Sequence, residues 1–463
     1  MNNEELRRNK YRRKKAMLRK VQNKMGVAFF VIILVLFALA VRILLINYNH
    51  GEAYSKTVLD HQSYTSTTIP YKRGQIQDAN GTVLAYSERV YNLILDPKLI
   101  LSDEKYKEPT LTALTECFDL KRSDLESILA TKSTSQYEKL LKELTKDEIS
   151  EFESRVEDTK NNPYIKGVWF EDSYIRKYPF STQAADVIGF ASAANGGELG
   201  LENYYDEELS GTDGISYSYV GENLDVETQE KKAEDGYNLV TTIDYKVQSI
   251  IENKIKELNA ERPSKSTAVI AMNPKTGEIL AMASYPTFNL NNPRDLSGVY
   301  TQEELSTMTD IEMTDALYAL WSNYCVSTIY EPGSTFKPFT VAEGLEEGVI
   351  HDGDTFYCGG FMEVSGSIIN CHEHSGHGTV TVKEGLIQSC NPTMMQIAAK
   401  LGGVKIAKYE ALFGFGNRTG IDLPGEEAGL TIGEKMTVID AACNSFGQNI
   451  NVNMIQMVAG FSS

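Results

Sequence analysis

The residues best suited to chemistry lie between Glu331 and Thr340, in the run EPGSTFKPFT. Ser334 and Lys337 are three positions apart, which places both on one face of a helix. Pro338 is tolerated only near the first turn of a helix, so it predicts that Ser334 lies at the helix start. Free backbone N–H groups at that end favour an alkoxide and an oxyanion. A partly desolvated Lys337 amine can be neutral and accept the serine proton. We therefore predict a serine nucleophile with a lysine base; the alternative is a plain N-cap serine.

A second polar element follows 55 residues later, where Ser389, Cys390 and Asn391 precede an apolar helical stretch. It is the only Ser-x-Asn in the chain. The Ser389 hydroxyl can relay a proton, and the Asn391 carboxamide can hold a substrate amide. The alternative is a loop whose polar residues only cap a helix.

The elements that must position these residues follow from the spacing of apolar side chains. Residues 245–261 carry them on one helical face, and residues 267–272 and 278–284 read as two strands. The turn between these strands contains Gly277, which can supply a positive φ. A helix followed by an antiparallel hairpin indicates an α+β domain from about residue 236 onward, with helices packed on an antiparallel sheet.

The preceding part of the chain has a mixed character. Residues 50–100 read as short extended pieces joined by turns, among them Asn80-Gly81. Residues 108–160 carry apolar side chains at spacings of three and four, which predicts a small helical insert. We therefore expect one mixed domain over residues 49–235.

The N-terminal region predicts a membrane anchor. Residues 1–24 hold ten Lys or Arg and two Glu, whereas the net charge of the whole chain is −18. Residues 26–48 form a largely apolar stretch whose only charged residue is Arg42, and it is long enough to cross a bilayer. The basic residues before it place a cytoplasmic tail at 1–25 and the body outside the cell, on a single-pass anchor in the cell membrane. A cleaved signal peptide is the alternative, but no small-x-small site follows.

The two polar elements together resemble those of the penicillin-recognising serine acyltransferases, which combine Ser-x-x-Lys, Ser-x-Asn and Lys-Thr/Ser-Gly. Within this group, the chain is similar to class B penicillin-binding proteins of the division and sporulation type. The resemblance covers nearly everything after residue 25 and rests on RGQIQDANGTVLA, RKYPFSTQAADVIGF, GTDG, NPKTGEILAMAS, YEPGSTFKPFT, QSCNPTMMQIA, GIDLPGE and NSFGQ. It implies a dimerisation-type pedestal at 49–235 and a transpeptidase domain at 236–463, with no separate glycosyltransferase domain.

The resemblance also implies a mechanism, acyl transfer without a cofactor or metal. Ser334 would attack the penultimate D-Ala carbonyl of a peptidoglycan stem peptide, with Lys337 as base. Ser389 would relay a proton to the leaving amine, and Asn391 would hold the donor peptide. An amine of a neighbouring stem peptide would then resolve the acyl-enzyme, and β-lactams would acylate the same serine covalently. The Ser334 N–H would supply half of the oxyanion hole.

Two departures from the family pattern stand out. The only Lys-Thr-Gly, Lys275-Thr276-Gly277, precedes Ser334, whereas the family's third motif follows the Ser-x-Asn element on an edge strand. We therefore expect the chain to lack a C-terminal part of the transpeptidase domain and to be essentially inactive alone. The second departure is Asn449, which stands where the family usually has Gly.

Cysteine and histidine spacing leaves alternatives open. Of six cysteines, only Cys358 and Cys371 are close in sequence and similarly framed, so they are a candidate redox pair; free buried thiols are equally compatible. The segment Cys371 to His377, CHEHSGH, holds three of the six histidines and invites a zinc hypothesis. Because the family's corresponding loop carries no metal, we expect a surface loop without metal.

Three functions compete at this point. The first is a D,D-transpeptidase acting in septation, elongation or sporulation. The second is a non-catalytic scaffold of a cell-wall synthesis complex, which would engage a membrane-embedded glycosyltransferase or divisome-type partners through anchor and pedestal. The third is a β-lactamase or β-lactam sensor, which would need no pedestal. The acidic body argues against nucleic acid as a partner.

Overall fold

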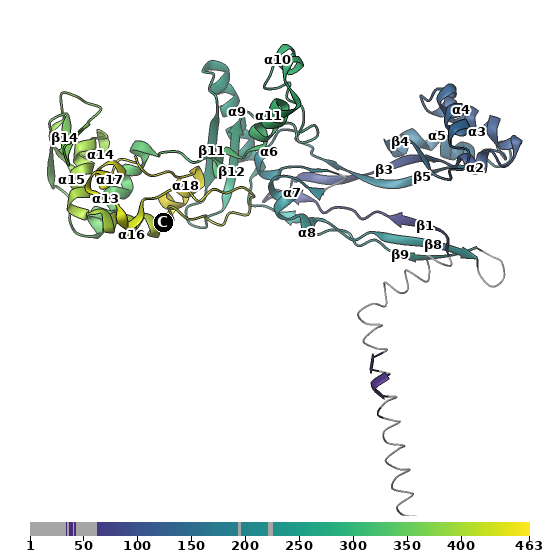
Figure 1. Cartoon of the computed structure of the whole chain (residues 1–463), viewed down its shortest axis with the longest axis horizontal. Coiled ribbons are helices and arrows are strands. Elements are labelled where there is room, and N and C mark those ends of the chain that lie inside the picture. Colours follow the sequence, from purple (N-terminus) through teal and green to yellow (C-terminus); the bar gives the residue numbers. More distant parts are fainter. Residues whose placement is uncertain (1–33, 35–36, 40, 43–62, 193–195, 221–225) are drawn as a thin grey trace, which may run out of the picture. The chain divides into compact units, whose positions relative to one another are not determined.

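A computed structural model describes residues 34, 37–39, 41–42, 63–192, 196–220 and 226–463 (Figure 1). The predicted membrane anchor at 26–48 lies almost entirely outside these residues. Within the described ranges, no helix is both long enough and apolar enough to cross a membrane. Contacts divide the chain into two units, residues 1–69 with 213–232 and residues 70–212 with 233–463.

The first unit contains a three-stranded antiparallel sheet in the order β1-β8-β9. β1 (Ser63–Ile69) pairs with β8 (Gly214–Val220), which pairs in turn with β9 (Val226–Lys231). Ser, Thr and Tyr dominate β1 and β8, and Thr and Tyr favour extended backbone. The pairing therefore joins two segments that are far apart in the sequence.

The long strand β3 (Val83–Leu95) organises the first part of the second unit. β5 (Val168–Lys177) pairs with it from Tyr86 to Leu95, and β4 (Glu138–Leu144) occupies its other edge. The inward residues of these strands share one apolar core with four helices. The remaining elements of this part are β2 (Ile76–Gln77), β10 (Leu239–Val240), α2 (Pro97–Ile100), α3 (Glu104–Cys117), α4 (Arg122–Thr131) and α5 (Lys146–Glu157).

The strand β4 corrects the prediction of an all-helical insert at 108–160. Three helices lie in or across that range, but residues 138–144 are extended. The leucines at 140, 141 and 144 have a spacing that also suits a helix. Their backbone instead pairs with the free edge of β3, where Leu141 faces Leu93. A partner strand about 50 residues away overrides the local pattern, as is common for strands.

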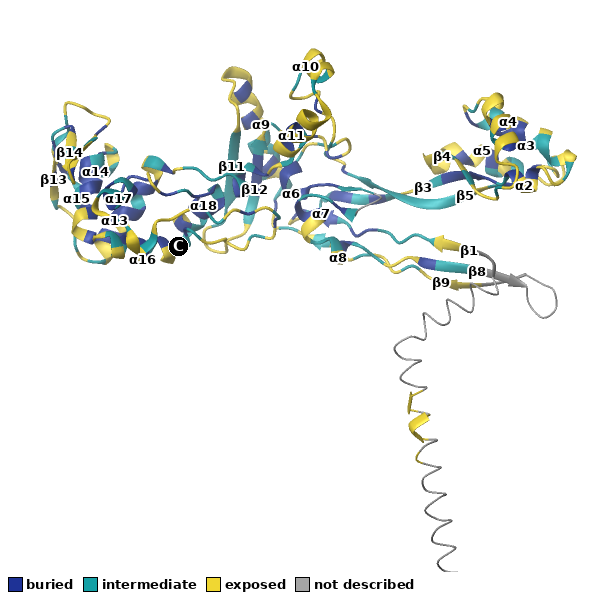
Figure 2. Ribbon diagram, viewed as in Figure 1, coloured by how far each residue is buried: buried dark blue, intermediate teal, exposed yellow. Residues whose placement is uncertain are grey.

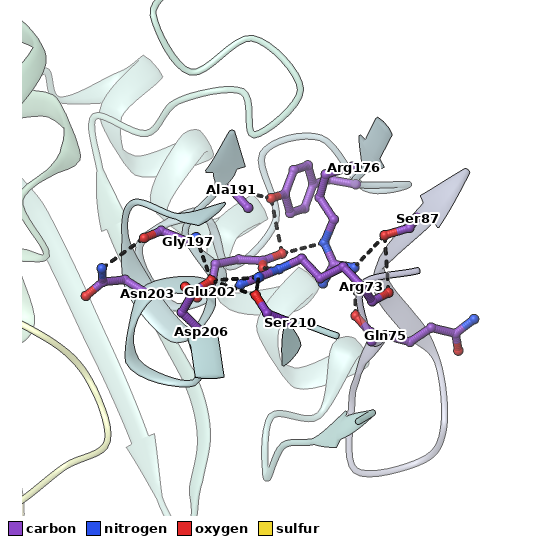
Figure 3. Close-up of polar contacts among 12 residues, drawn as sticks. Arg73, Gln75, Ser87, Arg176, Ala191, Gly197, Glu202, Asn203, Asp206 and Ser210 are labelled. Atoms are coloured by element: carbon purple, nitrogen blue, oxygen red, sulfur yellow. Dashed lines mark hydrogen bonds and ion pairs between the residues drawn. The ribbon is translucent and has the colours of Figure 1, made fainter. Parts of the chain in front are cut away.

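A buried ion cluster stabilises the centre of the second unit (Figure 3). The fully buried carboxylate of Glu202 accepts hydrogen bonds from Arg73 Nε at 2.7 Å and Arg176 Nε at 2.6 Å. The Tyr178 hydroxyl donates to the same carboxylate at 3.2 Å, and Arg73 also reaches Asp206 at 2.6 Å. Because the charges are paired, their burial is tolerated. The elements near the cluster are α6 (Ala185–Ile188), β6 (Ala191–Ser192), β7 (Gly196–Gly197), α7 (Gly200–Tyr204) and α8 (Asp206–Leu209).

The chain after residue 240 confirms the α+β prediction. α9 (Tyr245–Glu261) packs on the antiparallel hairpin of β11 (Thr267–Met272) and β12 (Ile279–Tyr285). Gly277 in the hairpin turn has a φ of 78°, as its position predicted. Apolar side chains from four further helices join the core of this hairpin: α10 (Gln302–Thr307), α11 (Asp310–Trp321), α12 (Tyr324–Ser327) and α18 (Met454–Ser462).

A second core surrounds α15 (Asn391–Leu401), which contacts α13, α16 and α17. Met394, Met395 and Ile397 of α15 are almost completely buried. Figure 2 shows buried residues gathered along these helices. The other elements are η1 (Gly333–Phe336), α13 (Lys337–Glu346), β13 (Thr355–Cys358), β14 (Phe361–Val364), β15 (Ser367–Asn370), β16 (Gly378–Thr381), α14 (Val382–Ile387), α16 (Gly403–Leu412), η2 (Gly433–Lys435) and α17 (Val438–Asn444).

Candidate active site

Ser334 lies in the 3₁₀ turn η1, directly before α13. Pro338 occupies the second position of α13, where its missing N–H costs no helical hydrogen bond. Phe336 is fully buried against Phe339 and Phe415, whereas Ser334 is exposed. The aromatic core thus fixes the helix start, and the serine hydroxyl is open to solvent, as the sequence predicted.

The loop NSFGQ supports this helix start through two backbone contacts. Gly333 N donates to Gly447 O at 2.9 Å, and the Thr340 hydroxyl donates to Ser445 O at 2.9 Å. Gly447 has a φ of 80°, and a Cβ built on it would lie 2.1 Å from the Gly333 carbonyl oxygen. Only glycine fits there, because both the conformation and the approach exclude a side chain.

Lys337 connects the two polar elements. Its side chain is 1% exposed, and Nζ donates to Ser389 O at 2.5 Å, to Ser389 Oγ at 2.8 Å and to Asn391 Oδ1 at 2.8 Å. The Ser389 hydroxyl donates in turn to Ser334 Oγ at 2.9 Å. The four predicted residues therefore lie together, and Ser389 stands between the lysine and the serine.

The Lys337 amine is poised near neutrality. Burial lowers the pKa of Lys337 to about 8, although the nearby thiols of Cys371 and Cys390 act in the opposite direction. At pH 7 about a tenth of such amines are neutral, against less than ~0.1% for a free lysine. A neutral amine has a free lone pair, so it can accept a proton that passes through Ser389.

Ser389 has an unusual backbone conformation, with a φ of 51°. Left-handed backbone costs a non-glycine residue roughly 1–2 kcal/mol. The conformation directs both the carbonyl and the hydroxyl oxygen of Ser389 to Lys337 Nζ. Asn391 is held as well, because its Nδ2 donates to Asn370 O at 3.2 Å. Such strain is typical of sites where function fixes the geometry.

The cysteines singled out from the sequence meet near this site. Cys358 ends β13 and Cys371 follows β15; both are buried free thiols. The structure adds His377 and Cys390, and the four ligand atoms lie within 4.8 Å of one another. The predicted surface loop at 371–377 is therefore wrong for Cys371, while residues 372–375 are exposed as expected. The sequence did not link Cys390 to the others, because only the fold brings it to them.

The early Lys275-Thr276-Gly277 forms the turn of the β11–β12 hairpin. Thr276 and Gly277 line a cavity of about 690 Å³ whose described lining includes none of the four residues predicted to be catalytic. The tripeptide therefore does not take the place of the family's third motif, as the sequence indicated.

Two family models match the chain. The penicillin binding protein transpeptidase domain matches residues 267–463, and the penicillin-binding protein dimerisation domain matches residues 68–241. The transpeptidase match lies within the second unit. The dimerisation-domain match lies mostly in the second unit and also includes the end of β1 and the strands β8 and β9 of the first unit.

Characterised relatives span most of the chain. Stage V sporulation protein D of Bacillus subtilis is 32% identical over 410 residues, which is 86% of this chain and 58% of that protein. Peptidoglycan D,D-transpeptidase MrdA of Acinetobacter baumannii is 26% identical over 423 residues, which is 86% of this chain and 59% of that protein. The chain thus spans slightly under 60% of the length of these relatives.

Solved structures share the fold. Penicillin Binding Protein 2X from Streptococcus thermophilus has a TM-score of 0.70 at 24% identity, covering 86% of this chain and 59% of that one. PBP2 in its complex with MreC from Helicobacter pylori has a TM-score of 0.65 at 21% identity, covering 85% of this chain and 75% of that one.

Proposed function

Because the chain belongs to the class B penicillin-binding proteins, we propose that it is a peptidoglycan D,D-transpeptidase working through a serine acyl-enzyme. One observation carries this proposal, the hydrogen-bonded chain from Lys337 through Ser389 to the exposed Ser334, with steps of 2.8 and 2.9 Å. A buried amine linked to an exposed hydroxyl is the arrangement that an activated serine needs. A serine that only caps a helix would not require a buried amine linked to its hydroxyl.

Acylation begins when Ser334 Oγ attacks the penultimate D-Ala carbonyl of a stem peptide. The Ser334 proton passes to Ser389 Oγ, whose own proton passes to the neutral Lys337 amine. The backbone N–H of Ser334 stabilises the oxyanion at the positive end of α13. When the C–N bond breaks, the terminal D-Ala amine takes a proton back through Ser389. An ester on Ser334 results.

The acceptor step reverses this proton path. An amine of a second stem peptide attacks the ester and gives its proton through Ser389 to Lys337, and Ser334 leaves as the hydroxyl. Asn391 holds the donor peptide through its carboxamide, whose Nδ2 and Oδ1 are fixed by Asn370 and Lys337. A β-lactam follows the first half of this scheme and stays on Ser334.

The rate of acylation depends on a second hydrogen-bond donor to the oxyanion. In the family pattern it belongs to the strand with Lys-Thr/Ser-Gly, and residues 392–463 contain no such tripeptide. Removing one oxyanion donor costs roughly 10²–10³ in rate. The rate at which Ser334 is acylated therefore depends on a second donor beside the Ser334 N–H.

Location and partners complete the proposal. Residues 26–48 anchor the protein in the cell membrane, with the basic tail in the cytoplasm. The partners are membrane-embedded wall-synthesis proteins that engage anchor and pedestal. The similarity to PBP2, solved in complex with MreC, supports a partner of the elongation or division machinery. The relation to stage V sporulation protein D supports a sporulation role.

Labelling of the purified chain with a fluorescent penicillin tests the chemistry. We expect covalent labelling that peptide mapping places on Ser334, and its loss in Ser334→Ala and Lys337→Ala. The matched control is the other Ser-x-x-Lys, changed by Ser102→Ala and Lys105→Ala, which should label normally. Normal labelling of Ser334→Ala contradicts the serine mechanism, and a folded chain that never labels favours the scaffold.

A further inference from the structure

Two buried carboxyl groups, those of Glu343 and Glu410, take no part in the acyl transfer described above. Glu343 lies in α13, one turn after Thr340, and Glu410 lies in α16. Each residue is 1% exposed, so neither carboxyl is open to water. Both oxygens of Glu343 and Oε2 of Glu410 are buried without a hydrogen-bond partner among the described residues. Because buried polar groups are normally hydrogen-bonded, these three oxygens require a donor.

Both carboxyls belong to the surroundings of the C-terminal end of α17. Asn444, the last residue of that helix, donates from Nδ2 to Glu410 Oε1 at 2.6 Å. The carbonyl of the next residue, Ser445, accepts a hydrogen bond from the Thr340 hydroxyl at 2.9 Å. Thr340 is one helical turn before Glu343 on α13. Two different helices therefore bring their carboxyls to the same end of α17.

No basic side chain pairs with either carboxyl in the part of the chain that the structure describes. The charged and phenolic groups on the helices around them have other partners. On α16 these are Lys405 and Lys408, which lie 2.7 and 3.7 Å from Glu347, and Tyr409, which donates to Glu347 at 3.0 Å. On α14, α15 and α17 they are Glu384 with Thr381, Lys400 with the ring of Phe356, and Asp440 with Thr437. Two ionised carboxylates without a cation would repel each other in this core, so the pair cannot carry two charges.

One proton on the pair removes this repulsion. Burial raises the pKa of Glu343 to about 9, and the carboxylate of Glu410 adds to the rise. Burial also raises the pKa of Glu410, to about 6, although the hydrogen bond from Asn444 opposes the rise. At pH 7 Glu343 is therefore protonated and Glu410 is ionised. A protonated carboxyl donates as well as accepts, so it supplies the donor that the buried oxygens require.

A continuous series of contacts leads from Glu410 to the nucleophile. Asn444 binds Glu410 through its side chain, and the Asn444 carbonyl accepts a hydrogen bond from Gly447 N at 2.8 Å. Gly447 O in turn accepts from Gly333 N at 2.9 Å. Gly333 is the residue before Ser334, so the position of the serine depends on the loop that Asn444 begins.

We propose that Glu343 and Glu410 share one proton in the folded protein, and that this buried carboxyl pair positions Ser334 through the loop at residues 444–447. Both are positioning residues, because they act through Asn444 and not on the reacting atoms. Since the folded pKa of Glu343 is raised, the pair is intact at pH 7 and is lost as the pH rises through about 9. Two negative charges then face each other at the end of α17. The proposal rests on the proposed function for the reaction of Ser334, whereas the protonation of the pair does not.

Infrared difference spectroscopy of the folded chain tests the shared proton without using activity. A protonated carboxylic acid has a carbonyl stretching band that ionised carboxylates lack. At pH 8, where Asp186 and Glu410 are mostly ionised, we expect this band in the parent chain and its loss in Glu343→Gln. In the unaltered chain the band should disappear as the pH passes about 9, which keeps the test valid if a variant fails to fold. A folded parent chain without the band at pH 8 would overturn the proposal.

Amide hydrogen exchange at pH 7 measures the effect of the pair on the loop. Glu343→Ala removes the donor, whereas Glu343→Gln keeps an N–H donor of similar size. The amides of Gly333 and Gly447 should exchange about tenfold faster in Glu343→Ala than in the parent chain, and Glu343→Gln should restore most of the protection. The matched control is Glu346→Gln, an exposed carboxylate on the same helix, which should leave both amides unchanged. Equal exchange in Glu343→Ala and the parent would overturn the positioning role.

The pH dependence of penicillin labelling separates positioning from a merely structural role. The labelling rate of the parent divided by that of Glu343→Gln should fall about tenfold between pH 8 and pH 10, because the protonated fraction of Glu343 falls from about nine-tenths to about a tenth. Lys337 is unchanged in both chains, so its titration cancels in the ratio. A ratio independent of pH would overturn the role of the pair at Ser334. An absence of labelling in both chains would count against the proposed function, and the infrared band and the amide exchange would still decide whether the pair exists and holds the loop.

Discussion

The carboxyl group of Asp186 should make this protein less stable as the pH rises from 5 to 8. The carboxyl lies in α6, where Oδ2 accepts a hydrogen bond from the Ser284 hydroxyl of β12. Oδ1 is buried and has no hydrogen-bond partner among the described residues. Burial raises the pKa of Asp186 from 3.8 to about 7, and the carboxylate of Glu252 adds to the rise. The folded protein therefore holds this proton more tightly than the unfolded chain.

The size of the effect follows from the difference between the two pKa values. About three pH units at ~1.36 kcal/mol each give about 4 kcal/mol. Because the folded pKa is raised, this stabilisation is complete below pH 3.8 and is lost as the pH rises through about 7. Between pH 5 and pH 7 Asp186 alone should remove about 2 kcal/mol from the free energy of unfolding.

The substitution Asp186→Asn removes the charge and keeps the shape. We expect Asp186→Asn to gain about 3 kcal/mol relative to the parent chain between pH 5 and pH 8, because asparagine does not titrate. Urea unfolding at several pH values measures this gain. Trp321 packs on the same core, so its fluorescence is a suitable probe in a Trp169→Phe background.

The matched control is Asp295→Asn, an exposed carboxylate whose pKa is lowered by its hydrogen bond to Ser297. Its effect should be small and of opposite sign, since stability from a lowered pKa is lost as the pH falls. A constant difference between Asp186→Asn and the parent chain, within ~0.5 kcal/mol from pH 5 to pH 8, would refute the reasoning. It would mean that Asp186 is ionised in the folded protein.

Three further substitutions test the scaffold around the site. Glu202→Ala leaves two buried guanidinium groups without their shared carboxylate, so urea unfolding should show a loss of about 3–5 kcal/mol; a loss below ~1 kcal/mol would show that the cluster is hydrated. Ser389→Gly should be about 1 kcal/mol more stable than Ser389→Ala, because only glycine adopts the observed φ without strain; equal melting temperatures would disprove that strain. Gly447→Ala should lower stability by about 1–3 kcal/mol and slow penicillin labelling, because its Cβ collides with the Gly333 carbonyl. Unchanged labelling would show that this loop does not help to position Ser334.

The arrangement of Ser334 and Lys337 at a helix start could be predicted from the sequence, because it depends only on residues next to one another in the chain. Ser334, Lys337 and Pro338 lie within five residues, and the rules for helix starts fix their relation. The contact of Ser389 with Lys337 was predicted only through the family resemblance. Nothing in the spacing gives the left-handed φ of Ser389, since Ser is an uncommon choice there.

The parts that could not be predicted depend on long-range packing. Strand β4 forms because its backbone pairs with the edge of β3. Cys390 joins Cys358, Cys371 and His377 only because the fold brings the start of α15 to the end of β13. Asn449 is an instructive intermediate case. Its φ is 62°, and its N–H donates to Glu331 Oε1 at 2.9 Å. Asn tolerates left-handed backbone better than most residues, which explains how it replaces the family's usual Gly.

The pairing of β3 with β5 has a consequence for how this protein can vary in size. Leu95 faces Val168, so the intervening segment of about 70 residues leaves and re-enters the sheet at adjacent positions, roughly 5 Å apart. A tight turn would be long enough to join the two strands at that point. The segment is thus an appendage with its own core, to which the two strands contribute Leu93, Leu95, Val168 and Phe170. Insertions and deletions among related chains should concentrate there, and a graft that replaces it would leave the ion cluster on Glu202 and the Ser334 site undisturbed.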